Sequence, residues 1–211
     1  MYHVLFGIFT EMRVLCFLIL LLVKTVLGQN IGLTVYNGLN FSALNMSKNT
    51  SIDYKSNSNN DLRVGVVFGD QEGYSASILL SKLNVINAHT SEILTTKLAL
   101  GYTVMDFQVR KTTNSKIFKS VALGPTVYLL NFADQRNNNL VVRNSRSLNK
   151  TIFGVNSQID FKSWHLAQQI KCIPYIYYRV NLSNLESDTE GADVLRLTTF
   201  GIGINTTLLW I

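Results

Sequence analysis

The sequence predicts an all-β protein, a transmembrane antiparallel up-and-down β-barrel of about eight strands. Apolar and polar residues alternate with a period of two through most of the chain, and a period of 3.6 is almost absent. Hydrophobic residues make up 47% of the 211 residues and charged residues only 15%. After residue 30, however, no stretch reaches the roughly 20 apolar residues of a membrane helix. Long and short polar connections also alternate, which is typical of a membrane barrel with outer loops and inner turns.

This composition excludes several classes of protein. Only 2 prolines and a formal net charge of +6 indicate one ordered domain rather than a disordered or collagenous chain. Cys16 and Cys172 allow at most one disulfide and form no C-x-x-C pair, so disulfide scaffolds and zinc fingers are excluded. A soluble β domain, a secreted glycoprotein and a membrane β-barrel remain.

The N-terminal segment has the layout of a secretory signal peptide. An apolar run at residues 14–23 follows the basic start that opens at Met12, and small residues precede the cleavage site. We predict a signal peptide at 1–28, with Met12 as an alternative start, and an outer-membrane β-barrel domain at 29–211. The run of about 10 residues is shorter than a spanning helix requires, so an uncleaved membrane anchor is the weaker alternative. Cleavage removes Cys16, which leaves one cysteine and no internal disulfide.

The first four predicted strands cover residues 31–42, 62–68, 74–85 and 94–110. The first has one wholly apolar face, which consists of Ile31, Leu33, Val35, Leu39 and Phe41. The second is short, and the third alternates apolar residues with serines. The fourth changes parity, since Leu100, Tyr102 and Val104 share one face whereas Phe107 and Val109 continue the apolar pattern on the other. One extra residue swaps the faces of a strand, so we predict a β-bulge near Val104.

The last four predicted strands cover residues 120–129, 153–161, 170–180 and 199–210. Each has one apolar parity, which in the last strand consists of Phe200, Ile202, Ile204, Leu208 and Trp210. Gly201 and Gly203, on the opposite parity, fit sheet curvature and a crowded interior. The long connections are 43–61, 86–92, 132–150 and 181–193, and the short turns are 69–73, 111–115 and 162–167. We place the N-terminus on the periplasmic side and the long loops outside.

The composition of the polar faces indicates which face of each strand lies inside the barrel. In a soluble barrel they would meet water and carry many Lys and Glu residues, but here they are mostly Gly, Ser, Thr, Asn and Tyr. We therefore expect the apolar faces to meet lipid and the polar faces to fill a narrow interior. Charged residues expected to pair inside are Arg63, Asp106, Arg110, Asp160, Lys171 and Arg179. Aromatic residues expected at the membrane interfaces are Tyr36, Phe41, Tyr74, Phe107, Phe161, Trp164, Tyr178 and Trp210.

Several short motifs occur in a fixed order along the chain. They include Gly38-Leu39-Asn40-Phe41-Ser42, Ala122-Leu123-Gly124-Pro125, and Phe200-Gly201-Ile202-Gly203-Ile204. With residues 74–82 and 177–184, they resemble the PorT-like outer-membrane β-barrel proteins of Bacteroidota. The resemblance implies an outer-membrane location, insertion by the barrel assembly machinery, and assistance to secretion as one role. The chain departs from the family by ending on Trp210-Ile211 rather than on an aromatic residue, and by Met105-Asp106 in place of an Ile-Pro step.

We predict no catalytic, cofactor-binding or metal-binding residue, no cofactor and no enzyme activity. The mature chain has only two histidines, His89 and His165, both in predicted connections, with Ser91 and Ser163 as sequence neighbours. A barrel-embedded lipid-modifying enzyme that pairs a His with a Ser is one alternative function. No glycine-rich loop joins a strand to a helix, so nothing indicates nucleotide binding, and no nucleic-acid partner is expected.

We expect a small outer-membrane barrel that acts through its outer loops in envelope structure, adhesion, ligand binding or secretion, and not an open porin. Its expected partners are outer-membrane lipid, lipopolysaccharide, and a protein or glycan at loops 43–61 and 132–150. The second of these loops contains a basic cluster of Arg136, Arg143, Arg146 and Lys150, which would attract phosphates. An exported soluble β-barrel that binds an apolar ligand is an alternative.

Six N-x-S/T sequons favour a different alternative, a secreted glycoprotein. They lie at Asn40, Asn45, Asn49, Asn149, Asn181 and Asn205. A chain rich in Asn, Ser and Thr contains several such sequences by chance. Asn40 and Asn205 also fall in predicted strands, where glycans do not fit.

Overall fold

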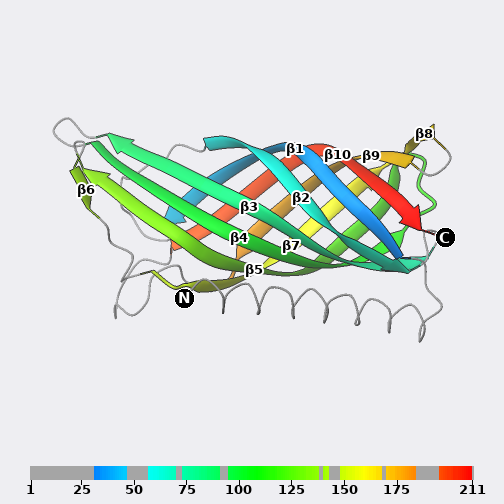
Figure 1. Ribbon diagram of the computed structural model, residues 1–211, viewed down its shortest axis with the longest axis horizontal. Coiled ribbons are helices and arrows are strands. Elements are labelled where there is room, and N and C mark those ends of the chain that lie inside the picture. Colours follow the sequence, from blue (N-terminus) through cyan, green and yellow to red (C-terminus); the bar gives the residue numbers. More distant parts are fainter. Residues whose placement is uncertain are drawn as a thin grey trace, which may run out of the picture.

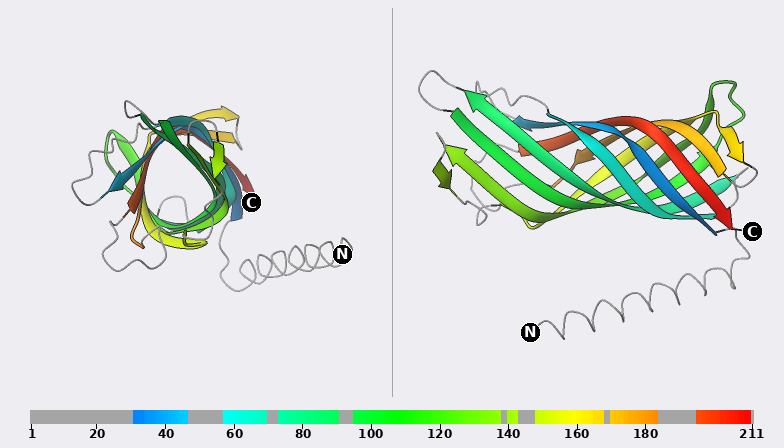
Figure 2. Two further views of the ribbon diagram at one scale, coloured as in Figure 1. Left: turned by 90° about the vertical axis from the view of Figure 1, so that its left-hand side faces the viewer. Right: turned by 45° about the horizontal axis from the view of Figure 1, so that its top comes forward.

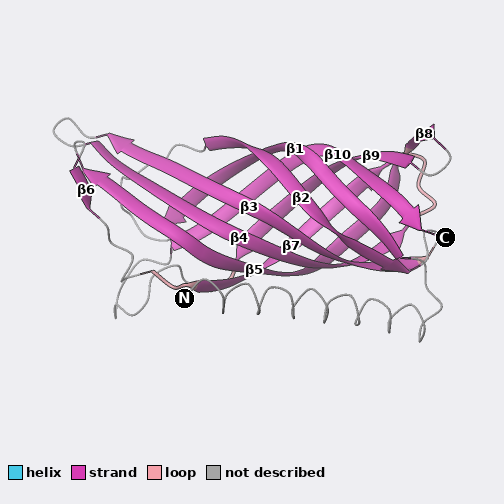
Figure 3. Cartoon of the chain, viewed as in Figure 1, coloured by secondary structure: helices cyan, strands magenta, loops and turns pink. Residues whose placement is uncertain are grey.

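The computed structural model describes residues 31–46, 57–69, 73–90, 95–137, 140–142, 148–167, 170–183 and 195–210. These residues form one antiparallel sheet of ten strands, which are β1 (Ile31–Met46), β2 (Asn57–Gly69), β3 (Tyr74–Thr90), β4 (Thr95–Thr112), β5 (Phe118–Asn137), β6 (Leu140–Val142), β7 (Thr151–Phe161), β8 (Trp164–Ala167), β9 (Ile170–Asn181) and β10 (Leu195–Trp210). Figure 3 shows these strands and the short turns between them. Within the described residues, no helix is long and apolar enough to cross a membrane.

Eight of the strands form a closed wall, in the order β10, β1, β2, β3, β4, β5, β7 and β9 (Figure 1). Pairing of β9 with β10 closes the wall, which Figure 2 shows end-on as a ring. The remaining two strands are short additions, β6 on β5 and β8 on β9. Closure matters because lipid offers no hydrogen-bond partner to the backbone, so a free strand edge is not tolerated there. The predicted fold class is confirmed.

The two ends of the barrel differ in their connections. At one end, here called the inner end, short turns join β2 to β3 and β4 to β5, and Ile31 at the start of β1 pairs with Trp210 at the end of β10. At the other, the outer end, most of the connections are longer. Barrels of this kind place short turns on the periplasmic side and longer loops outside.

The sequence alternation corresponds to an outer and an inner face. Strand β1 exposes Leu33, Val35, Leu39 and Phe41 on the outside and buries Thr34, Tyr36, Asn40 and Ser42 inside. Strand β7 alternates in the same way from Thr151 to Phe161. The expected orientation, with apolar side chains outward, is confirmed. A soluble barrel would expose its polar faces to water, so that alternative is wrong.

At the outer end, β3 and β5 extend further than the sequence predicts, and both pair there with β4. Residues 86–92, predicted to be a loop, are mostly strand, because Ile86 pairs with Ala99 and Thr90 pairs with Thr95. In Figure 1 these three strands project beyond β1 and β10 on the left. The misassignment has a physical cause: strands outside lipid need no apolar outer face, so their polar composition resembles that of a loop. We call residues 82–90, 95–104 and 130–137 the projecting sheet.

The polarity of the two faces inverts where the projecting sheet begins. In the part of β3 nearer the inner end, Ile78 and Leu80 point outward and Ser77 and Ser81 point inward. Further along the same strand, the polar residues Lys82 and Asn84 point outward and the apolar residues Leu83 and Val85 point inward, although the next outward residue, Ile86, is apolar. Apart from the exposed apolar side chains of Ile86 and Phe132, the described part of the projecting sheet has the polarity of a soluble sheet, while the part of the barrel nearer the inner end has that of a membrane barrel.

This inversion explains why the predicted β-bulge near Val104 is wrong. Strand β4 pairs with β3 without a register shift, and its even-numbered residues from Leu100 to Arg110 are all buried. The interior changes from polar to apolar along the strand, but the strand does not swap its faces. An irregularity does exist in the partner strand, because Gly101 pairs with Phe132 and Tyr102 pairs with Leu130. The extra residue there is Asn131 of β5.

The exposed apolar residues form a belt with polar and aromatic limits. Its outer limit is marked by the outward polar residues Asn60, Lys82, Asn84, Thr103 and Asn131. Exposed aromatic residues lie towards the inner end at Tyr74, Phe118 and Trp164, and towards the outer end at Phe41, Phe153, Tyr178 and Phe200. Tyr36, expected at an interface, is instead fully buried inside, because it follows the polar parity of β1. The side chain of Trp210 lies outside the described residues.

The belt predicts how the barrel responds to a charge on its outer face. Ile204→Arg replaces an outward residue that is 44% exposed in the belt, and we expect it to lower the free energy of unfolding by about 2–4 kcal/mol. Asn84→Arg, outward but above the belt, should change it by less than about 0.5 kcal/mol. Urea unfolding in phospholipid vesicles measures both. Equal costs at the two positions would contradict a lipid-facing belt.

Candidate functional site: the barrel interior and its outer end

Three arginine–aspartate pairs lie inside the barrel. Nε of Arg63 is 3.1 Å from Oδ2 of Asp61, and Nε of Arg110 is 3.0 Å from Oδ2 of Asp160. Arg179 makes a bidentate contact with Asp106, with Nε donating at 3.1 Å to Oδ1 and at 3.0 Å to Oδ2, and Nη2 also donating to Oδ2. All six side chains are buried. Buried charges that lack a partner are very costly, so each arginine requires its aspartate.

Five of the six charged residues predicted to pair inside are found in these pairs. The sixth, Lys171, has a side chain outside the described residues. Sequence reasoning missed Asp61, because it assigned residues 43–61 to a loop. The signal that could have found it is parity, since Asp61 lies two positions before Arg63 and therefore shares its face.

Neutral donors add hydrogen bonds to two of the three aspartates. Asp160 accepts hydrogen bonds from the Ser120 hydroxyl at 2.7 Å and from Nε2 of Gln158 at 2.6 Å. The hydroxyl of Thr126 donates to Asp106 at 2.7 Å. Because these donors come from β5 and β7, the network ties strands on several sides of the wall across the interior. Hydrogen bonds in a buried network of this kind are stronger than in water, because the local dielectric constant is low.

Arg63 is enclosed by tyrosine rings. Its guanidinium carbon lies 4.5 Å from the ring centre of Tyr36, 4.6 Å from that of Tyr175 and 4.0 Å from that of Tyr177. Cation–π contacts in a desolvated site stabilise an arginine more than exposed ones do. A Cβ at Gly201 would collide with the Tyr177 ring, so this glycine makes room for the cage. The expectation that Gly201 faces a crowded interior is confirmed.

The interior becomes apolar towards the outer end. A buried cluster there consists of Leu83, Val85, Leu100, Tyr102, Val104, Tyr128, Ala133, Ile152 and Leu197. At its border with the polar region, the rings of Tyr102 and Tyr128 meet edge to face with centroids 6.0 Å apart. In the described strands the interior is thus filled by a band of polar side chains that includes the three ion pairs. Nearer the outer end it is filled by the buried apolar cluster, here called the apolar cap. Water and ions cross such an apolar segment poorly.

The histidines considered as catalytic candidates lie at opposite ends of the barrel. His89 is in β3 opposite Thr96 near the outer end, and His165 is in β8 opposite Lys171 near the inner end. Both are in strands rather than in the predicted connections, and their side chains lie outside the described residues, as does Ser91. Ser163 borders a small pocket at the inner end. No group of three or more metal-ligating side chains occurs in the described part of the chain.

Three of the six sequon asparagines are buried inside the barrel. Asn40 and Asn205 are in β1 and β10, as predicted, and are 1% and 0% exposed. Asn181, predicted to be in a loop, is also buried, and its side chain donates to the carbonyl of Ser183 at 2.6 Å and accepts from the N–H of Leu197 at 2.5 Å. These sites have no room for a glycan, which removes much of the support for a secreted glycoprotein.

The outer end carries mostly basic residues on its described surface. The exposed ones are Lys82, Lys150 and Arg196, against the single carboxylate of Asp134. Lys97 and Arg136 belong to the strands there, but their side chains lie outside the described residues. Lys97 and Arg136 are directly opposite each other in the projecting sheet. Of the predicted basic cluster, Arg143 and Arg146 lie outside the described residues. The connection 184–194, also outside them, is acidic in sequence, but it joins β9 to β10, and β10 is halfway round the wall from β4.

The environment of the barrel follows from these features together. The outer face is an apolar belt between aromatic residues, the backbone is paired all round the wall, and the charges are paired inside. A closed antiparallel barrel with such a belt is the form in which β-sheets cross an outer membrane. This chain is an outer-membrane β-barrel protein.

Solved structures similar to this barrel include several outer-membrane proteins. AlkL, determined in lipid bilayers, has a TM-score of 0.47 at 9% identity over 86% of this chain and 90% of that one. Ail, the attachment invasion locus protein of Yersinia pestis, has a TM-score of 0.45 at 10% identity over 84% and 98%. Neisserial surface protein A has a TM-score of 0.44 at 12% identity over 82% and 95%. No family model and no curated protein sequence matches the chain.

The ion pairs predict a large effect when one partner alone is removed. Asp106→Asn leaves Arg179 buried without a counter-charge, and we expect it to cost about 3–5 kcal/mol of unfolding free energy. The double variant Asp106→Leu with Arg179→Met removes both charges and should recover most of that loss. Asp134→Asn, which changes a carboxylate outside the interior, is the control. If the double variant is as unstable as the single one in urea, the pairing argument fails.

Proposed function

We propose that this barrel is a non-catalytic attachment or ligand-binding protein that acts through its outer end. The partner that fits best is an anionic polymer, such as a polysaccharide bearing sulfate, carboxylate or phosphate groups. The observation that carries the proposal is the filled interior: the three ion pairs and the apolar cap occupy the space through which a solute would pass. A function by transport is therefore disfavoured, and the accessible surfaces at the ends remain.

The projecting sheet supports the choice of the outer end. It lifts the ends of β3, β4 and β5 above the apolar belt and so holds a surface away from the membrane. The excess of basic over acidic residues there gives this surface a positive potential, which speeds and strengthens association with anions. Envelope structure and secretion remain weaker proposals. The resemblance to PorT-like proteins supports secretion only through short motifs.

Binding of an anionic polymer tests this proposal directly. We expect the protein in detergent micelles to bind fluorescent dextran sulfate and not neutral dextran. Lys97→Glu with Arg136→Glu reverses two charges in the projecting sheet and should weaken binding by about tenfold or more, since 1.4 kcal/mol is tenfold in Kd. Lys111→Glu with Lys116→Glu makes the same charge change at the inner end and serves as the control.

Two outcomes would contradict the proposed function. Equal loss of binding in the two double variants would mean that net charge alone attracts the polymer. A stable ion conductance of the wild-type protein in planar bilayers would show an open path through the barrel, and the protein would then be a channel.

We also propose that residues 1–28 are a signal peptide that is removed on export. This rests on the basic start, the apolar run and the small residues before Gln29. N-terminal sequencing of the protein from the outer-membrane fraction is expected to begin at Gln29. A sequence that begins at Met1 or Met12 would show that the segment is retained.

A further inference from the structure

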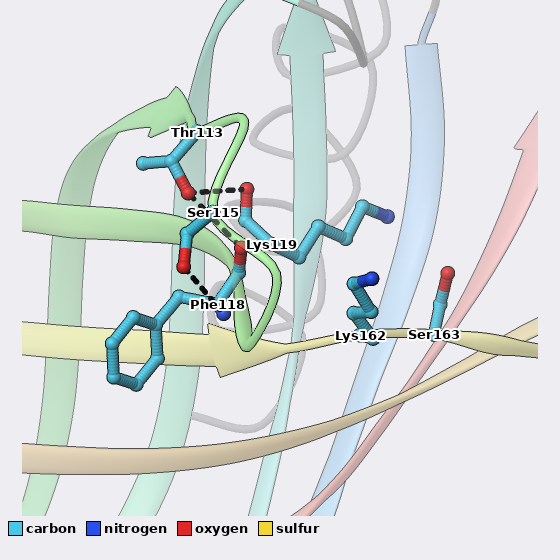
Figure 4. Close-up of a pocket in the computed structure, with 6 residues that line it drawn as sticks. All are labelled: Thr113, Ser115, Phe118, Lys119, Lys162 and Ser163. Carbon is cyan, nitrogen blue, oxygen red and sulfur yellow. Dashed lines mark hydrogen bonds between the residues drawn. The ribbon is translucent and has the colours of Figure 1, made fainter.

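The inner end of the barrel carries a small pocket between two neighbouring turns (Figure 4). It has a volume of about 280 Å³ and is lined by Thr113, Ser115, Phe118, Lys119, Lys162 and Ser163. The first four residues belong to the turn between β4 and β5 and to the start of β5, and the last two connect β7 to β8. Pockets for drug-sized ligands occupy roughly 300–1,000 Å³. This one is suited to a single small polar group.

Hydrogen bonds within the β4–β5 turn fix one wall of the pocket. Thr113 donates its N–H to the carbonyl of Lys119 at 2.8 Å and its hydroxyl to the carbonyl of Phe118 at 3.0 Å. The hydroxyl oxygen of Ser115 accepts from the N–H groups of Ile117 and Phe118 at 3.2 and 3.3 Å. A serine hydroxyl that accepts in this way keeps its own O–H to donate to a ligand. The wall is thus formed by the turn itself.

A β-bulge directs Lys119 into the pocket. Phe118 pairs with Phe161 and Ser120 pairs with Asp160, so Lys119 is an extra residue between two regular pairs. Bulges re-aim side chains in this way. The bulge brings Lys119 to the same pocket as Lys162 of the neighbouring connection, and Figure 4 shows both lysine side chains extending to one side of the turn. Two ammonium groups beside hydroxyl donors are the chemistry that binds a phosphate group.

The pocket lies at the boundary between the lipid-facing belt and water. Phe118, which lines it, packs its ring 5.7 Å from that of Phe161 at the inner end of the belt. Two more lysines, Lys111 and Lys116, are exposed at the same end of the barrel, and within the described residues no carboxylate is exposed there. Asp70 and Glu72 follow β2 in sequence and lie outside the described residues. One side of the pocket is therefore apolar and the other basic.

We propose that this pocket binds the phosphate headgroup of an anionic phospholipid of the inner leaflet. The ammonium groups of Lys119 and Lys162 bind the phosphate oxygens, and the hydroxyls of Ser115 and Ser163 donate hydrogen bonds to them. Phe118 contacts the glycerol and the first acyl carbons. Free phosphate shares the chemistry of the headgroup, but it would leave the aromatic side of the pocket without a contact.

Retention of lipids by the purified protein tests the proposal. Native mass spectrometry of the barrel, released from micelles that contain equal amounts of phosphatidylglycerol and phosphatidylcholine, reports which lipid stays bound. We expect a preference for phosphatidylglycerol, and a reduction of that preference by about tenfold in Lys119→Gln with Lys162→Gln, since each lysine near an anionic surface contributes several-fold. Lys111→Gln with Lys116→Gln removes the same charge from the same rim outside the pocket and should retain most of the preference.

Each other outcome would overturn the assignment. If both double variants lose the preference equally, the rim attracts anionic lipid diffusely and the pocket is no site. If inorganic phosphate at low millimolar concentration displaces the lipid, the ligand is soluble phosphate. If the wild-type protein retains the two lipids alike, there is no headgroup selectivity. Heat-modifiable migration of each variant on an unboiled gel confirms that it has folded.

Discussion

The pairing of three buried arginines with three aspartates is the interaction on which the rest of this barrel depends. A lipid-facing outer surface requires the apolar face of every strand to point outward. The polar faces of the eight strands are then left inside a space too narrow for bulk water. Charges in such a space are tolerated only as hydrogen-bonded pairs. Arg63, Arg110 and Arg179 meet this condition with partners on their own or other strands, and Tyr36, Tyr175 and Tyr177 fill the space around Arg63. The same pairs that permit the fold also occupy the path of any solute.

Sequence alternation predicted the closed barrel, its orientation towards lipid and most of the interior charges, because a period of two follows directly from strand geometry. The sequence prediction failed where a strand kept the same face inward but its surroundings changed from membrane to water along its length. Val104 suggested a bulge, although β4 keeps one face inward from Leu100 to Arg110 and only the neighbours inside change from polar to apolar. Asp61 was missed and Tyr36 was misplaced for a related reason: composition was used to decide strand ends and interfaces, and these depend on where the membrane begins. The pocket at the inner end had no linear signal, since a bulge at Lys119 and a separate connection at Lys162 create it.

The two ends of the barrel lie in different surroundings. The inner end remains close to the membrane, so its lysines and aromatic residues lie at the level of lipid headgroups, where basic and amphipathic side chains are favoured. The outer end departs from the membrane, and the projecting sheet must bury apolar side chains on its own interior instead of in lipid. A filled barrel of this kind offers its two rims, rather than its axis, for recognition.

The inversion of polarity along β3, β4 and β5 accounts for both the apolar cap and the projecting sheet. Within the belt, lipid solvates Ile78, Leu80 and Phe107, and the interior can be polar. Above the belt, water replaces lipid, so an outward apolar face is unfavourable and most of the described apolar residues lie inside, with Ile86 and Phe132 as exposed exceptions. Leu83, Val85 and Leu100 do so without a change of register, because the sequence exchanges residue types between the two faces at Ser81 and Lys82. The cap is therefore the hydrophobic core of the extramembrane part, and the closure of the interior follows from how the strands are stabilised outside the membrane.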